Sequence, residues 1–213
     1  MKIGVFDSGR GGLAVAQRLR ELLPEAEIVS ADDHSHVPYG GRPASEIINL
    51  ADAALQPLFA ARCDAIVLAC NTVTTVAITT LRSRYPEQTF IGIEPMVKPA
   101  AALTKSNHIA VLATVATLQS RRYRELKETW ARNLDVIEPD CSTWATAIET
   151  GQENMVPAEA VITQCLAAGA DVIVLACSHF HWLKPRIQAA AGPHVTVLEP
   201  SDALKERIVS LVG

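Results

Sequence analysis

The sequence lacks the features that would place it in a membrane or on a nucleic acid. Its net charge is −4 over 213 residues, and no block of five or more like charges occurs, so nothing indicates an electrostatic partner of either kind. Apolar runs such as AIVLA and VIVLA cover only a few residues, far short of a membrane crossing. The opening residues, MKIGVFDSG, lead directly into a strand-like run and a glycine turn, so we expect no signal peptide.

The cysteines lack the pattern of a disulfide framework or a zinc site. Their number is odd and no pair has CxxC spacing, which argues against both. We therefore expect free thiols in a reducing cytosol. The five positions are Cys63, Cys70, Cys141, Cys165 and Cys177.

What the sequence does contain is a regular alternation of short β-branched runs with longer segments of helical period. Nearly continuous apolar strands spaced in this way are typical of parallel sheets covered by helices on both faces. The fold class is therefore α/β. The predicted strands span 2–6, 26–31, 65–69, 89–93, 108–113, 134–138, 172–176 and 194–199, and the clearest helical patterns span 13–23, 45–61 and 157–169.

The sequence also repeats itself. Ile-Val-Leu-Ala-Cys occurs twice, ending at Cys70 and at Cys177. KIGVFDS resembles HIAVLAT, and the Glu-Pro after FIGI recurs after VTVL, each at a spacing of about 106 residues. We interpret this as two pseudo-symmetric α/β domains of ordinary size. We expect residues 1–94 to form the first, joined by 192–213, and residues 95–191 to form the second.

Cys70 and Cys177 are the strongest candidates for chemistry. A cysteine that ends an apolar strand is commonly an inert core residue. Here, however, two occur in duplicated contexts, and each is followed by polar side chains. Because ligands of open parallel sheets bind beyond the carboxyl ends of the strands, facing domains would present the two thiols from opposite sides. Two opposed thiols suit stereoinversion at a carbon that bears a proton, and a helix N-terminus after each strand would favour the thiolate.

The first turn, FDSGRGGLA, supplies the main alternative. Gly9, Gly11 and Ala14 match G-x-G-x-x-A after a strand, and acidic residues end the next strand, as in a dinucleotide-binding oxidoreductase. Two points argue against an oxidoreductase. The negative charge of Asp7 would lie too close to a bound pyrophosphate, and the second half of the chain, with both cysteines, would have no role. Asp7 can instead pair with a substrate ammonium or orient a proton-transfer partner, and Ser8 can bind a carboxylate.

Further candidates have a structural reading beside the functional one. The loop that contains Tyr39 can pack or close over a ligand. Thr114 and Thr117 can cap a helix or bind a ligand, since their place in the repeat lies opposite Asp7 and Ser8. Glu149 lies in a predicted helix that ends at Gly151, and His179 can act as an acid, a base or a thiolate partner. The metal-ligand spacing of a zinc site is absent around His34, His36 and His181.

With these residues in view, the sequence resembles the glutamate racemases of the cofactor-independent aspartate/glutamate racemase superfamily. The motifs that carry the resemblance are GVFDSGRGGL (4–13), VPYGG (37–41), ACNTVT (69–74), GIEPMVKPA (92–100), VLATVATLQS (111–120) and LACSH (175–179). The resemblance implies two-base interconversion of L- and D-glutamate, with no pyridoxal phosphate, metal or nucleotide. It also implies a homodimer in a bacterial cytosol that supplies D-glutamate for peptidoglycan.

The resemblance assigns roles position by position. Cys70 and Cys177 resemble the two bases, Asp7 and His179 their respective partners, and Glu149 a further acidic residue of the site. The substrate-binding positions that it implies are Ser8, Pro38, Tyr39, Gly40, Asn71, Thr72, Thr114, Thr117 and Ser178.

The sequence departs from the family pattern at three places. Arg10 stands where the family usually has a small apolar residue, Ser178 replaces a threonine, and Phe180-His181 replaces Tyr-Pro. The alternatives left open are the same chemistry on aspartate or another small acidic amino acid, the dinucleotide-binding oxidoreductase, and a catalytically silent amino-acid binder.

Overall fold

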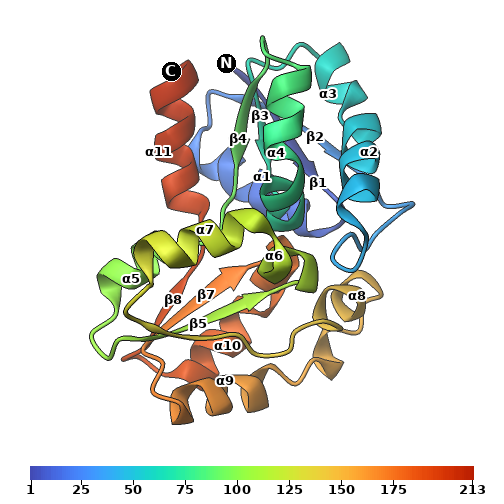
Figure 1. Cartoon of the computed structure of the whole chain (residues 1–213). Helices are drawn as coiled ribbons and strands as arrows, with labels where there is room; N and C mark the ends of the chain where they lie inside the picture. Colours follow the sequence, from blue (N-terminus) through green and yellow to red (C-terminus); the bar gives the residue numbers. More distant parts are fainter.

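The molecule consists of two α/β units, one above the other in Figure 1. The computed structural model describes residues 1–201 and 203–213. The first sheet has the order β2-β1-β3-β4 and the second the order β6-β5-β7-β8, and every neighbouring pair is parallel, so the expected fold class is confirmed. The strands are β1 (Lys2–Asp7), β2 (Glu27–Asp32), β3 (Ala65–Leu68), β4 (Thr89–Gly92), β5 (His108–Ala113), β6 (Asp135–Ile137), β7 (Val172–Ala176) and β8 (Thr196–Leu198).

The identical strand order in both sheets explains the sequence repeat. In each sheet the chain moves outward from its first strand to one side and then returns to pair on the other side. Such a reversal leaves a crevice at the carboxyl ends of the two central strands, which is where ligands bind in open α/β sheets. Asp7 and Cys70 lie at the ends of the central strands of the first sheet, and Thr114 and Cys177 at those of the second.

Helices cover both faces of each sheet. In the first helix, Val15, Ala16 and Leu19 are buried at helical spacing and pack against the sheet. The helices of the first unit are α1 (Gly11–Leu22), α2 (Ala44–Ala54), α3 (Gln56–Ala60) and α4 (Asn71–Arg84). Those that follow are α5 (Val97–Leu103), α6 (Val115–Gln119), α7 (Arg121–Trp130), α8 (Trp144–Glu149), the 3₁₀ helix η1 (Glu153–Met155), α9 (Ala158–Ala167), the 3₁₀ helix η2 (Ser178–Leu183), α10 (Lys184–Ala191) and α11 (Ser201–Val212).

Helix α4 has an unusual composition for its position. Its sequence NTVTTVAITT is rich in β-branched residues, which have lower helix propensity than alanine or leucine. Residues 71–75 are all buried, since the helix starts at the carboxyl edge of the first sheet and also contacts α6 of the second unit. Packing between the units therefore stabilises the start of α4.

The last segment of the chain divides between the two units. Strand β8 pairs with β7 in the second sheet, whereas Leu204 and Ile208 of α11 belong to the core of the first unit, beside which α11 lies in Figure 1. The expected assignment of all of 192–213 to the first unit therefore differs from the structure at β8, because this strand completes the second sheet. We propose a division in which 1–94 with 201–213 form one unit and 95–200 form the other.

Among residues 1–201 and 203–213, no helix has both the length and the apolar character needed to span a bilayer.

Truncation of Ile208 tests the attachment of α11 to the first unit. Ile208 is 0% exposed and clusters with Ile3 and Ile91, whereas the adjacent Val209 is 48% exposed. We expect Ile208→Ala to lower the free energy of unfolding by about 2–4 kcal/mol, because it leaves a cavity in the core. Val209→Ala, the matched control, should change it by less than about 0.5 kcal/mol. Urea unfolding monitored by circular dichroism measures both, and equal effects would contradict the attachment.

Candidate active site

Cys70 lies between β3 and α4 and occupies the N-cap position of the helix. Its Sγ is 3.4 Å from Oγ of Ser8. Burial, the charge of Asp7 and the second thiol, Cys177, raise the pKa of Cys70 to about 12, although hydrogen bonds from Ser8 and the Val73 amide act in the opposite direction. The amide of Val73, in the first turn of α4, favours the Cys70 thiolate, but burial outweighs it and the net pKa is raised.

Cys177 occupies the equivalent position between β7 and η2. The helix expected after β7 is a six-residue 3₁₀ helix, which lacks the full dipole of a longer α-helix. The polar partner is instead His179, whose Nδ1 lies 3.8 Å from Sγ of Cys177. Ser178, between them, donates from Oγ to Oδ1 of Asp7 at 2.7 Å and so joins the two units.

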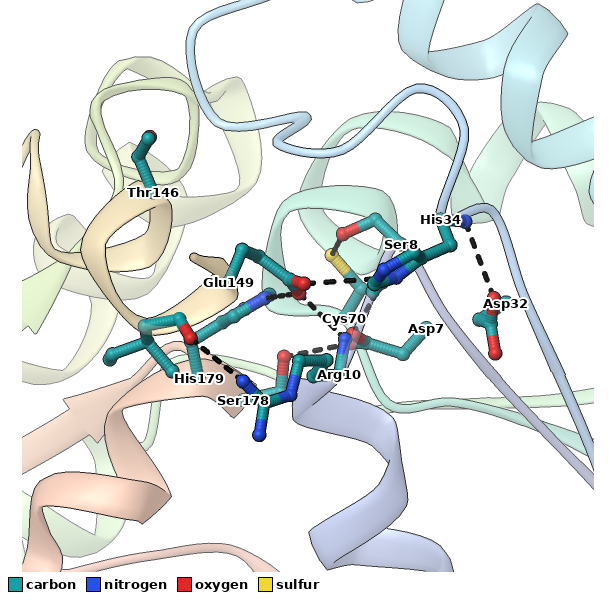
Figure 2. A network of polar contacts seen from close by, with 12 residues as sticks. Asp7, Ser8, Arg10, Asp32, His34, Cys70, Thr146, Glu149, Ser178 and His179 are labelled. Carbon is teal, nitrogen blue, oxygen red and sulfur yellow. Dashed lines mark hydrogen bonds and ion pairs between the residues drawn. The ribbon is translucent and has the colours of Figure 1, made fainter. Parts of the chain in front are cut away.

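Glu149 and His179 form a buried ion pair, which Figure 2 shows near the centre of the polar network. Glu149 Oε1 accepts a short hydrogen bond from His179 Nε2 and a second one, of 2.6 Å, from the backbone amide of Arg10. Burial alone would lower the pKa of His179, but hydrogen bonds to Cys177 and Glu149 raise it to about 11. Burial would likewise raise the pKa of Glu149, yet the bonds from His179 and Arg10 bring it below its usual range. The pair is therefore charged, and a cationic imidazole faces Cys177.

Asp7, at the end of β1, is 1% exposed and stands on the side of Cys70. Burial raises its pKa, although His179, Ser178 and the backbone amide of Gly9 all favour the anion. Its second oxygen accepts the Gly9 amide at 2.9 Å. The carboxyl group is thus hydrogen-bonded by both units and has a raised affinity for a proton.

A cluster of three threonine hydroxyls bridges the units beside the thiols. Thr72 Oγ1 lies 2.9 Å from Thr114 Oγ1, and Thr117 Oγ1 lies 3.1 Å from Thr114 Oγ1. Thr114 also caps α6 by accepting the Thr117 amide, so its capping role is present together with its place in the site. The carbonyl of Gly40 accepts the Ala116 amide at 2.9 Å, which brings the loop 37–41 against the same cluster.

The remaining predicted binding residues make their side-chain bonds within the first unit. Tyr39 is buried and its hydroxyl donates to Asp33 at 2.7 Å, and Asn71 Nδ2 donates to the Ile93 carbonyl at 3.0 Å. Pro38 is half-buried in the loop before Tyr39. Their roles toward a ligand stay predictions.

The glycine turn is closely packed against the second unit. A Cβ on Gly9 would overlap Oε1 of Glu149, and one on Gly11 would lie 2.5 Å from Oγ of Ser178. The amide of Arg10 already binds the Glu149 carboxylate. The anion at this turn is therefore the protein's own, and the structure gives no support to the dinucleotide-binding alternative.

Sequence reasoning missed two residues of this network. Arg10 was notable only as a departure from the family pattern, yet its backbone and side chain both contact the second unit. His34 lies with Nδ1 3.8 Å from Oε2 of Glu149, an oxygen that makes no hydrogen bond. No sequence signal identifies such contacts, because their partners are more than one hundred residues away.

The other three cysteines lie in the cores, as expected. Cys63 packs in the first unit and Cys141 and Cys165 in the second, and all are unpaired thiols. Over the described part of the chain, no group of three or more metal-ligating side chains comes together.

The chain matches racemases over almost its whole length. The model of the Asp/Glu/Hydantoin racemase family matches residues 12–208. The chain is 38% identical to a glutamate racemase of Roseiflexus sp. (strain RS-1), with 99% of this chain and 79% of that protein covered. It superimposes on Escherichia coli glutamate racemase in complex with L-glutamate and the activator UDP-MurNAc-ala with a TM-score of 0.84 and 27% identity, covering 99% and 81% of the two chains. For the glutamate racemase of Aquifex pyrophilus the TM-score is 0.80 and the identity 31%, covering 100% and 84%.

Two facing parallel-sheet units that each present a thiol define an amino-acid racemase. The chain belongs to the Asp/Glu/Hydantoin racemase family.

Close approach at Gly11 predicts that this position tolerates no side chain. We expect Gly11→Ala to lower the free energy of unfolding by about 1–3 kcal/mol, because the new Cβ overlaps Ser178 and the His179 backbone and the fit is already tight. Gly41→Ala is the matched control, since a Cβ added there would have no heavy atom beyond its chain neighbours within 4 Å. Urea unfolding should show little change for the control, and a Gly11→Ala protein as stable as the control would contradict the packed interface.

The ion pair predicts how His179 titrates. In Glu149→Gln the hydrogen-bonded anion is lost, so the pKa of His179 should fall from about 11 toward its ordinary value of 6.5. Nitrogen-15 NMR of the imidazole rings measures the midpoint, with the His179→Gln protein as the assignment reference. Glu153→Gln, which alters a carboxylate four residues away, is the control and should leave the midpoint in place. An unchanged midpoint in Glu149→Gln would show that Cys177 and Asp7 alone keep the imidazole charged.

Proposed function

We propose that this protein interconverts L- and D-glutamate by transfer of the α-proton between two thiols. The observation that supports this most is the combination of thiols at equivalent strand ends in two facing units with similarity to glutamate racemases over 97–99% of the chain. Strand ends at a change of strand order are the ligand-binding position of this class of sheet. A substrate held there is reached by Cys70 from one unit and by Cys177 from the other.

We assign the two thiols unequal starting states. Cys70, beside Asp7, holds its proton in this closed arrangement, since the pKa of its thiol is raised to about 12. Cys177 faces the imidazolium of His179, and we propose that it starts the reaction as a thiolate with this cation next to it. In this state Cys177 is set to accept the α-proton of one enantiomer while Cys70 delivers a proton to the opposite face. In the return reaction Cys70 accepts the α-proton and Cys177 donates one. Asp7, whose pKa is raised, is the acid–base group beside Cys70.

Substrate binding must open existing protein–protein bonds. The hydroxyls of Ser8, Thr72 and Thr114 and the backbone amides of the glycine turn are donors of the kind that bind carboxylates. These donors are now bonded to Cys70 and Asp7 of the same unit or to residues of the facing unit. We propose that the α-carboxylate and ammonium groups of glutamate replace these bonds, with Asp7 positioned to contact the ammonium.

We further propose that the protein is a homodimer in the cytosol and that it supplies D-glutamate for peptidoglycan. These three points depend on the family resemblance, and size-exclusion chromatography with light scattering tests the assembly.

Proton NMR of L-glutamate in D₂O under reducing conditions tests the function. We expect loss of the α-proton signal and formation of D-glutamate, and a decrease in rate of roughly 10²–10⁴-fold in Cys70→Ser and in Cys177→Ser, because each removes one acid–base group. Cys63→Ser is the matched control, since Cys63 is 6% exposed and each candidate base 5%. It should retain activity.

Other outcomes identify the alternatives. Exchange with L-aspartate alone would keep the mechanism and change the substrate. Thermal stabilisation by glutamate without exchange would indicate a silent binding protein and overturn the racemase proposal.

A further inference from the structure

Three contacts of Arg10 reach the second unit. Its amide donates to Glu149 Oε1 at 2.6 Å, and its Nη1 donates to the carbonyl of Ile148 at 3.2 Å. Its guanidinium carbon lies 5.3 Å from the centroid of the Trp182 ring. Figure 2 shows Arg10 on the first unit with the Glu149–His179 pair beside it. One residue of the glycine turn is thus tied to both α8 and η2.

The side-chain contacts are those that a guanidinium favours. Ile148 lies in the last turn of α8, where carbonyls carry partial negative charge, and its carbonyl also accepts the Gly151 amide at 3.1 Å. A planar guanidinium can stack on an aromatic ring while donating hydrogen bonds in its own plane. Arg10 and Trp182 therefore form a clasp across the two units, defined here as these two residues with the Ile148 carbonyl.

The clasp lies next to Glu149, the residue whose hydrogen bond helps to raise the pKa of His179. Glu149 follows Ile148 directly, and only one of its oxygens is hydrogen-bonded. The other oxygen is buried without a hydrogen bond, with His34 at 3.8 Å. The carboxylate is thus anchored through Oε1 alone, by the Arg10 amide and the imidazole, and its distance from the imidazole also depends on where the end of α8 is held.

We propose that Arg10 is a positioning residue: through the clasp it fixes the end of α8 and so keeps Glu149 against His179, the partner of Cys177. The catalytic consequence depends on the proposed racemase function, whereas the positioning of Glu149 does not. The groups that face His179 are Cys177, Glu149 and Asp7, with His181 further along η2.

The decisive variant is Arg10→Met, which keeps a long stem and removes the charge and the donors. We expect the titration midpoint of His179, read by NMR of the ring nitrogens, to move toward that of the Glu149→Gln protein. We also expect kcat for glutamate to fall by about tenfold with KM changed less than about threefold, because a misplaced proton-transfer partner slows chemistry more than binding.

Variants of Trp182 test the same contact from the other unit. Trp182→Ala should lower kcat in the same direction, and Trp182→Phe should restore it to within about twofold, since a phenyl ring still accepts the cation. The Arg10→Met/Trp182→Ala double variant should be little slower than the slower single variant, because the two residues act through one contact. Trp130→Ala is the matched control: Trp130 is 44% exposed and Trp182 43%, and Trp130 lies 4.4 Å from Lys98 Nζ in a contact of the same kind away from the site. It should leave kcat and the His179 midpoint unchanged.

The results separate this proposal from the function. A wild-type His179 midpoint and wild-type kcat in Arg10→Met or Trp182→Ala would overturn the clasp, as would fully additive effects in the double variant. If the protein has no activity on glutamate, the proposed function fails, but the His179 midpoint of Arg10→Met still supports or overturns the positioning role. If Arg10→Met does not fold, the Trp182 pair supplies the same comparison.

Discussion

The contact between the two units depends on the hydrogen bonds of one buried carboxylate, that of Glu149. A buried charge is costly unless it is paired and hydrogen-bonded, and Glu149 obtains one partner from each unit. The Arg10 amide comes from the first glycine turn and the imidazole of His179 from the second unit. This shared anion therefore does two things: it keeps the units together at the carboxyl edges of their sheets, and it keeps His179 charged beside Cys177.

The two halves have the same topology but different electrostatics. Each sheet presents a cysteine after its third strand in chain order, at the same place in the fold. Cys70, however, adjoins a carboxylate and Cys177 adjoins an imidazolium. The difference arises from Asp7, the last residue of β1 in the first unit, and from His179 in η2 of the second unit. A duplicated scaffold thus provides two equivalent positions, and single side chains give them opposite electrostatic surroundings.

Much of the fold follows from local patterns, and the exceptions have physical causes. All eight strands were predicted, since parallel strands buried on both faces give near-continuous apolar runs. The helix expected over 45–61 is divided into α2 and α3, because Pro57 has no amide proton to donate. The segment after Cys177 forms a 3₁₀ helix, and residues 192–213 are divided between the units, since a short strand and an amphipathic helix each pack where an apolar face is open.

By itself, the sequence determined the α/β class, the duplication and the pair of cysteines, because these are expressed in periodicity and in motifs repeated along the chain. Only the tertiary structure decided which polar groups form hydrogen bonds or ion pairs with one another. Asp7 meets Ser178 across 171 residues and Arg10 meets Glu149 across 139. No local pattern encodes such pairs, since their energies arise from burial and distance after the two units have come together.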